Sequence, residues 1–129
     1  MVSVILTDSM INAGKVLILK LDQRGKSPEG AFWLYSPDIQ QWKLMLVYDF
    51  GNIGPKIFYK KIQDTIYAKK NEIGELSLVD VVLLKPDDPI VSLLRSKIRT
   101  GPDSISGIRF TNNVINGTVI DDAYIYRLR

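Results

Sequence analysis

The chain ends with GIRFTNNVINGTVIDDAYIYRLR (residues 107–129), and this stretch decides the class of fold. Ile108 and Phe110 alternate with polar residues, which is the period of a half-buried strand. Asn116 and Gly117 stand between two apolar pairs, and this dipeptide favours a two-residue hairpin turn, because both central positions of a type I′ turn have positive φ. The stretch therefore predicts strands and turns rather than a binding site made of its Asn, Gly and Asp residues. Two faces are expected in the last strand, with Tyr124, Tyr126 and Leu128 on one and Ala123, Ile125 and Arg127 on the other.

Over the whole chain, the spacing of apolar residues predicts three helices and five strands. The helices are expected at residues 9–23, 55–69 and 89–99, and the strands at 31–36, 42–49, 77–84, 107–112 and 123–128. Residues 2–7 fit either a short strand or a loose arm. With no repeat or linker, residues 1–129 form one domain of the α+β class, a single mixed sheet of about five strands packed with three helices.

The same patterns predict which side chains form the core. Nine should be almost fully buried: Leu17, Leu21, Leu46, Phe58, Ile62, Val82, Leu94, Ile108 and Phe110. The apolar face of the first helix is wide, because Val16 and Leu19 lie beside its main stripe. Such a helix needs covering by the rest of the domain or by a second subunit.

The 129 residues include no cysteine and no histidine. This excludes disulfides, thiol nucleophiles, His-assisted catalysis and metal sites built from Cys or His. We therefore expect no catalytic residue, no cofactor and no metal, and we favour a protein that is not an enzyme. The absence of a long apolar run and of a signal-peptide pattern predicts a cytoplasmic protein without membrane contact. The net charge of +3 permits an anionic partner without requiring one.

Several segments together resemble an uncharacterised family of small bacterial proteins. They are AFWLY, the strand containing Trp42, GPKIFYKKIQDTI, the PDDP helix start and SGIRFTNNVINGTVIDDAYIYRL. The resemblance covers most of the chain after residue 10. No activity is assigned to that family, so the resemblance implies no function and no site residue.

The most basic segment of the chain is the helix predicted after Gly54. Residues 55–70 contain five lysines and one aspartate. Lys56, Lys60 and Lys61, with Tyr59 beside them, have the chemistry to hold phosphate groups and to stack on bases. The alternative is an ordinary solvated helix face.

Three other patterns have a functional and a structural explanation. The turn GNIGPK (residues 51–56) places backbone amides at a helix start, but Pro55 removes one donor and the pattern matches no phosphate-binding motif. The pairs Asp87-Asp88 and Asp121-Asp122 have the chemistry to hold Mg²⁺, but a helix cap and a turn between strands are the favoured explanations. The aromatic residues Trp33, Tyr35 and Trp42 fit either the core or a partner surface.

Taken together, these patterns favour a non-catalytic binding or assembly domain, either a homo-oligomer or an accessory subunit of a bacterial system. Its expected partner is a protein or a second copy of itself. The alternative function is a nucleic-acid-binding accessory protein that uses the Lys-rich helix 55–70.

Overall fold

The computed structural model describes residues 5–101 and 104–129, so residues 2–4 of the strand considered at 2–7 lie outside the described part. One five-stranded mixed sheet and a C-terminal hairpin confirm the predicted α+β class. The helices are α1 (Asp8–Gln23), α2 (Pro55–Ala68), α3 (Lys70–Ile73) and α4 (Pro89–Arg95). The strands are β1 (Gly30–Ser36), β2 (Gln41–Val47), β3 (Val81–Leu84), β4 (Ile108–Ile115) and β5 (Thr118–Leu128).

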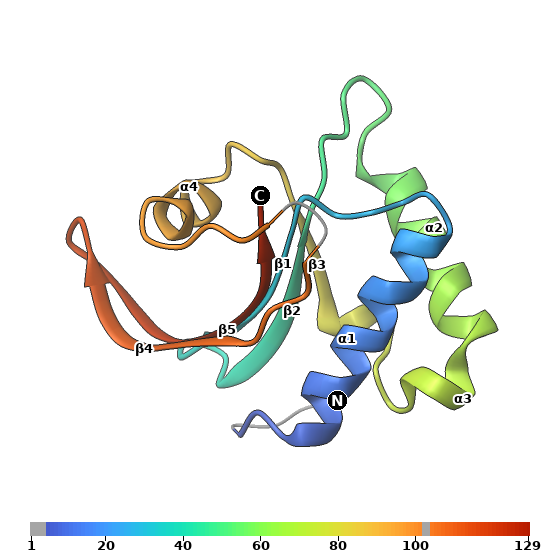
Figure 1. Ribbon diagram of the computed structural model, residues 1–129, viewed down its shortest axis with the longest axis horizontal. Helices are drawn as coiled ribbons and strands as arrows, with labels where there is room; N and C mark the ends of the chain where they lie inside the picture. The colour runs from blue at the N-terminus through green and yellow to red at the C-terminus, as the bar shows by residue number, and fades with distance from the viewer. Residues whose placement is uncertain (1–4, 102–103) are drawn as a thin grey trace.

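The strands lie in the order β3-β2-β1-β5-β4. β3 runs parallel to β2, because α2 carries the chain back between them, and every other neighbouring pair is antiparallel. Figure 1 shows α1, α2 and α3 on one face of the sheet and α4 on the other. The sheet is therefore covered on both sides.

This two-sided cover explains why β2 has no consistently polar face. Trp42, Leu44 and Leu46 pack in the cluster that includes α1 and α2. Met45 and Val47 point the other way and pack in the cluster that includes α4. Strands buried on both faces carry apolar runs instead of a strict alternation.

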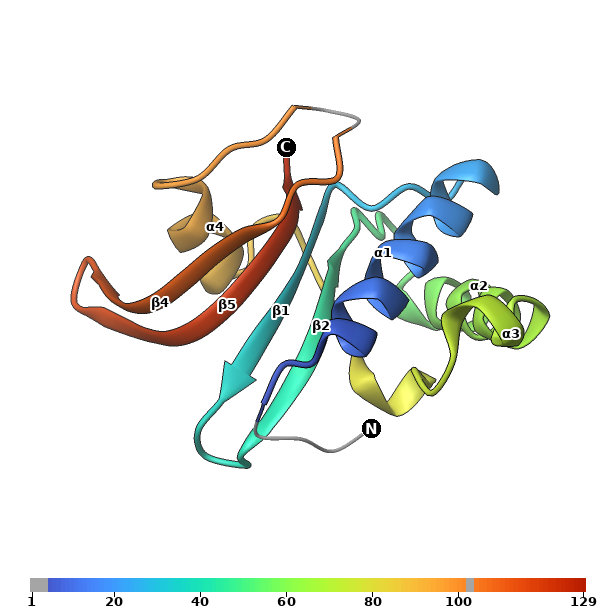
Figure 2. The ribbon, with the colours of Figure 1, turned by 60° about the horizontal axis from the view of Figure 1, so that its bottom comes forward.

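The main apolar stripe of α1 is covered within the single chain, whereas Leu19 beside it remains 39% exposed. Leu17, Ile18 and Leu21 are fully buried, in one cluster with residues of the sheet and of α2. Figure 2 shows α1 lying between the sheet and the pair α2 and α3. The rest of the chain therefore covers this stripe but leaves Leu19 exposed.

Four element boundaries differ from the prediction by three residues or more. β4 continues to Ile115 instead of ending at residue 112, and β5 begins at Thr118 instead of residue 123. The strand expected at 77–84 begins only at Val81, because residues 78–80 form a 3-10 turn in which the Asp80 carboxylate accepts a hydrogen bond from the Ser77 amide. The helix expected at 89–99 ends at Arg95. The predicted start of this helix is confirmed. Asp88 is the N-cap residue, its side chain accepts a hydrogen bond from the Ile90 amide at 3.0 Å, and Pro89 is the first residue of the helix.

Five of the nine predicted core residues are buried, and the prediction is wrong for the other four. The buried five are Leu17, Leu21, Leu46, Ile62 and Leu94. Val82, Ile108 and Phe110 are only half-buried because they lie on β3 and β4, the two edge strands, which have a neighbour on one side only. Phe58 is half-buried at the start of α2.

The alternation predicted for the last strand is confirmed for residues 123–126, but a β-bulge reverses it for Arg127 and Leu128. Ala31 of β1 pairs with Arg127 and Phe32 pairs with Ile125, so Tyr126 is an extra residue in the ladder. Tyr126 and Arg127 consequently both contact α1 or its C-terminal end, and Leu128 packs on the opposite face. A bulge redirects side chains in this way because it breaks the two-residue period.

Candidate binding surfaces

The lysines proposed as a phosphate grip lie on two different sides of α2. Lys56, Lys60 and Lys61 are all exposed. At 3.6 residues per turn, Lys56 and Lys60 share the outer side of the helix, whereas Lys61 is rotated about 140° from Lys56. Lys60 already forms a 3.8 Å ion pair with Asp64. The three residues therefore do not form one continuous grip.

Tyr59 connects α2 to the sheet. Its side chain is half-buried, and its hydroxyl accepts a hydrogen bond from the backbone amide of Leu83 at 3.1 Å. Leu83 belongs to the edge strand β3, so this contact satisfies a donor that has no neighbouring strand. The position of Tyr59 is explained by this structural role.

The aromatic residues considered for a partner surface belong mostly to the core. Trp33 is fully buried and donates from Nε1 to the Tyr126 hydroxyl at 2.9 Å. Trp42 is 3% exposed, with the Tyr35 ring on one side and the Arg109 guanidinium over it. The partner-surface hypothesis is therefore wrong for both tryptophans, and Tyr35 is half-buried.

A groove of about 440 Å³ lies between α2, the start of α3 and the segment that follows α3. Ile66, Leu76 and Leu78 supply apolar lining, and Tyr67 stands beside them with 83% of its surface exposed. The remaining lining residues are Gln63, Lys70, Gly74, Glu75 and Ser77. No local pattern predicts this groove, because its walls come from segments that meet only after folding. The one signal in the sequence is Tyr67, an aromatic residue that helical spacing places on the outer side of α2.

In the part of the chain that the structure describes, the groove itself is lined by one cation, Lys70, and one acid, Glu75, and further lysines lie on the surface around it. Within the described residues, Lys69 and Lys70 have no carboxylate within ion-pair distance, and Glu75 is the acidic residue of the lining. Lys56 and Lys60 extend the positive charge along the outer side of α2. An occupant of the groove would meet an apolar floor and a cationic edge.

The acidic pairs have structural roles. Asp88 caps α4, and both carboxylate oxygens of Asp122 accept hydrogen bonds from Arg109. The hydrogen bonds from Arg109 outweigh the effect of burial and lower the pKa of Asp122. Within residues 5–101 and 104–129, no three acidic side chains lie close enough together to hold a metal ion.

The turn GNIGPK leads directly into α2. Gly54 is its N-cap residue, with φ of 84°, and no side chain caps the first turn. Helix starts attract anions through their free amides, but Pro55 occupies the first position and has no amide hydrogen. No further feature at this turn points to a bound anion.

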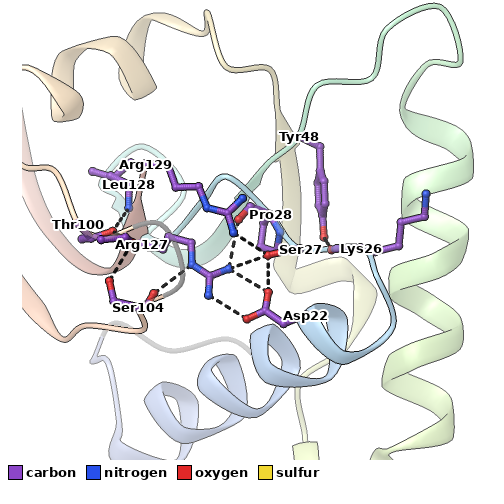
Figure 3. Close-up of polar contacts among 11 residues, drawn as sticks. Asp22, Lys26, Ser27, Pro28, Tyr48, Thr100, Ser104, Arg127, Leu128 and Arg129 are labelled. Atoms are coloured by element: carbon purple, nitrogen blue, oxygen red, sulfur yellow. Dashed lines mark hydrogen bonds and ion pairs between the residues drawn. The ribbon is translucent and has the colours of Figure 1, made fainter.

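The most polar buried cluster is an ion pair that joins the last strand to α1 (Figure 3). Arg127 is fully buried and donates to both carboxylate oxygens of Asp22, at 2.9 and 2.8 Å. It also donates to the Pro28 and Ser104 carbonyls. The β5 bulge turns Arg127 toward this position, so the cluster joins the last strand to the C-terminal end of α1.

The packing around this cluster and around α1 lowers the pKa of one carboxyl group and raises the pKa of two tyrosines. Burial alone would raise the pKa of the Asp22 carboxyl, but the hydrogen bonds from Arg127 and Ser27 and the charges of Arg127 and Arg129 together lower it. Burial raises the pKa of Tyr48 and of Tyr126. Shifted pKa values often mark catalytic sites, but here each one follows from a contact that holds the fold together.

A scan against protein families, a search of curated proteins and a search of solved structures each found no match to the chain. Within the described residues, no helix is both long and apolar enough to cross a bilayer. The geometry of the surfaces therefore carries the functional argument.

Proposed function

We propose that this chain is a non-catalytic binding domain, an accessory subunit that holds an extended segment of a partner protein in the groove beside α2. The observation that carries the proposal is the apolar groove with the exposed Tyr67 at its wall. Tyrosine is among the residues that contribute most to protein interfaces, because its rigid ring buries a large area at a small entropy cost.

The shape of the groove favours a side chain of a peptide over a whole small molecule. Sites for small ligands bury about 70–90% of the ligand surface. Here the ring that forms one wall is itself 83% exposed, so the groove is open on the Tyr67 side. One apolar side chain of the partner would rest on Ile66, Leu76 and Leu78, with its backbone running across the rim.

The charge of the rim specifies the residues on either side of that apolar side chain. Lys69 and Lys70 have no acidic partner among the described residues, and Lys56 lies farther along the same side of α2. Acidic residues beside the apolar one would be attracted to this edge, whereas basic residues would be repelled. The expected ligand is a segment with one large aliphatic or aromatic residue flanked by Asp or Glu.

Selection from a random peptide library displayed on phage tests this proposal. Wild-type protein should enrich peptides with Leu, Ile or Phe next to acidic residues, and Tyr67→Ser or Lys70→Glu should weaken their binding by about tenfold. The matched control is Val119→Ser, which changes another exposed apolar residue, 61% exposed, on the β4–β5 hairpin. Failure to enrich such peptides, or equal losses in the groove variants and the control, would refute the proposal.

A second copy of the chain is the competing occupant of the groove. Light scattering of the wild-type protein should give the mass of one chain, 14.6 kDa. A dimer that Tyr67→Ser converts to a monomer would instead assign the groove to self-association, and would overturn the choice of a different partner protein.

A further inference from the structure

Two cations at the C-terminal end of α1, Arg24 and Lys26, contact the side of α2 on which helical spacing also places Lys61. Arg24 donates from Nη1 to Thr65 Oγ1 at 2.9 Å. Lys26 Nζ lies 5.3 Å from the centre of the Phe58 ring, and Figure 3 shows its side chain reaching toward α2. Lys61 lies between Phe58 and Thr65 on the same side of the helix, since the three are separated by three and four residues.

The backbone holds two of these cations in place. Gly25, with φ of 73°, ends α1, and the amides of Gly25 and Lys26 bond to the carbonyls of Asp22 and Leu21 in a Schellman motif. The Lys26 carbonyl also accepts a hydrogen bond from the Tyr48 hydroxyl at 2.6 Å. The segment that carries Arg24 and Lys26 is therefore ordered before any ligand arrives.

The positive charge of this cluster is not neutralised by its surroundings. The C-terminal end of α1 supplies the equivalent of about half a negative charge, against three full positive charges. The neighbouring carboxylates are already engaged, Asp22 with Arg127 and Asp64 with Lys60. Within the described residues, Arg24, Lys26 and Lys61 have no acidic group within ion-pair distance.

We propose that Arg24, Lys26 and Lys61 form a binding site for a ligand that carries closely spaced phosphate groups. Thr65 and Phe58 are seven residues apart, so the cluster extends about 10 Å along α2, which suits more than one phosphate. Phe58 is half-buried beneath Lys26 and packs against Tyr48 and Phe50, which makes it a poor platform for a stacked base. The ligand is therefore recognised by its phosphates, either as a free polyphosphate or as a nucleic-acid backbone. The site lies across α2 from the groove and does not depend on the partner proposed for it.

Calorimetric titration at low salt, with inorganic tripolyphosphate and with a ten-residue oligothymidylate, tests the site. Lys61→Gln and Arg24→Gln should each weaken binding by about tenfold, the loss of one charge-assisted contact. The matched control is Lys60→Gln, which removes the same charge from the adjacent position on the outer side of α2 and should leave affinity almost unchanged. All three side chains are exposed, and melting temperatures check that each variant folds like the wild type.

The two probes separate the two sources of phosphate. Tighter binding of tripolyphosphate points to a free polyphosphate ligand. Tighter binding of the oligonucleotide, with a slope of log K against log salt near about −2 for three contacts on a single strand, points to a nucleic-acid backbone. If neither probe binds at low salt, the proposal is overturned. Equal weakening by Lys60→Gln and Lys61→Gln would also overturn it, because affinity would then depend only on the net charge of the protein.

Discussion

Replacing Gly14 with Ala should destabilise the protein, although alanine is the better helix former. Gly14 lies in the middle of α1, where the change would by itself add about 1 kcal/mol of stability. A Cβ atom there would overlap with Tyr126 Oη and lie 3.0 Å from Trp33 Nε1. Contacts this short cannot persist, so the tyrosine or the helix must move.

The size of the effect follows from what Tyr126 holds in place. Its hydroxyl accepts from Trp33 at 2.9 Å and donates to the Ile11 carbonyl at 2.6 Å, so it ties the sheet to α1. Breaking one of these hydrogen bonds costs about 1–3 kcal/mol, and overpacking a core costs a similar amount. After the gain in helix propensity is subtracted, we expect a net loss of about 3 kcal/mol.

A double-mutant cycle measured by urea unfolding isolates this clash. Tyr126→Phe removes the oxygen that the new methyl group would meet, so adding Gly14→Ala in that background should cost less than about 1 kcal/mol. Equal costs in the two backgrounds would show that the hydroxyl is not the obstacle. An increase in stability from Gly14→Ala alone would refute the close approach of α1 to the sheet.

Three further substitutions test the rest of the fold. Asp22→Asn should lower the free energy of unfolding by about 3 kcal/mol near pH 7, because it leaves Arg127 buried without its charged partner. The pKa of Asp22 is lowered in the folded protein, so the difference between wild type and variant should shrink as pH falls below about 4. A difference in urea melts that does not change with pH would contradict this prediction. Gly117→Ala should cost roughly 1–2 kcal/mol in a thermal melt, because φ at this turn is 82°, and an unchanged melting temperature would argue against the turn. Tyr59→Phe should cost about 1 kcal/mol and speed hydrogen exchange of the Leu83 amide, whereas unchanged exchange would mean that the hydroxyl does not protect it.

The helix α2 serves three surfaces at once. Its inner side, with Ile62 and Ile66, packs in the core. One flank forms the groove through Tyr67, and the other presents Lys61 beside α1. Because the two flanks contact different segments, a variant at one proposed site leaves the other site intact, and the two proposals can fail independently.

The elements that the sequence predicted correctly are those specified by residues close together in the chain. Asn116 and Gly117 adopt positive φ, 50° and 82°, in the turn that their side chains favour. Asp88 and Pro89 start α4 through one local hydrogen bond and one fixed dihedral. Turn chemistry, helix caps and apolar periodicity act over a few residues, so they can be recognised without knowing which segments later become neighbours.

The order of the strands decided what the sequence alone could not. Val82 and Phe110 carry core-like patterns, yet they are half-buried because β3 and β4 lie at the edges of the sheet. The bulge that turns Arg127 toward Asp22 arises from the pairing of β5 with β1, two strands far apart in the chain. The groove beside α2 and the cluster around Lys61 likewise join segments separated in sequence. Burial and charge at such places depend on which long-range neighbours arrive, and this is set by how the whole sheet and its helices pack.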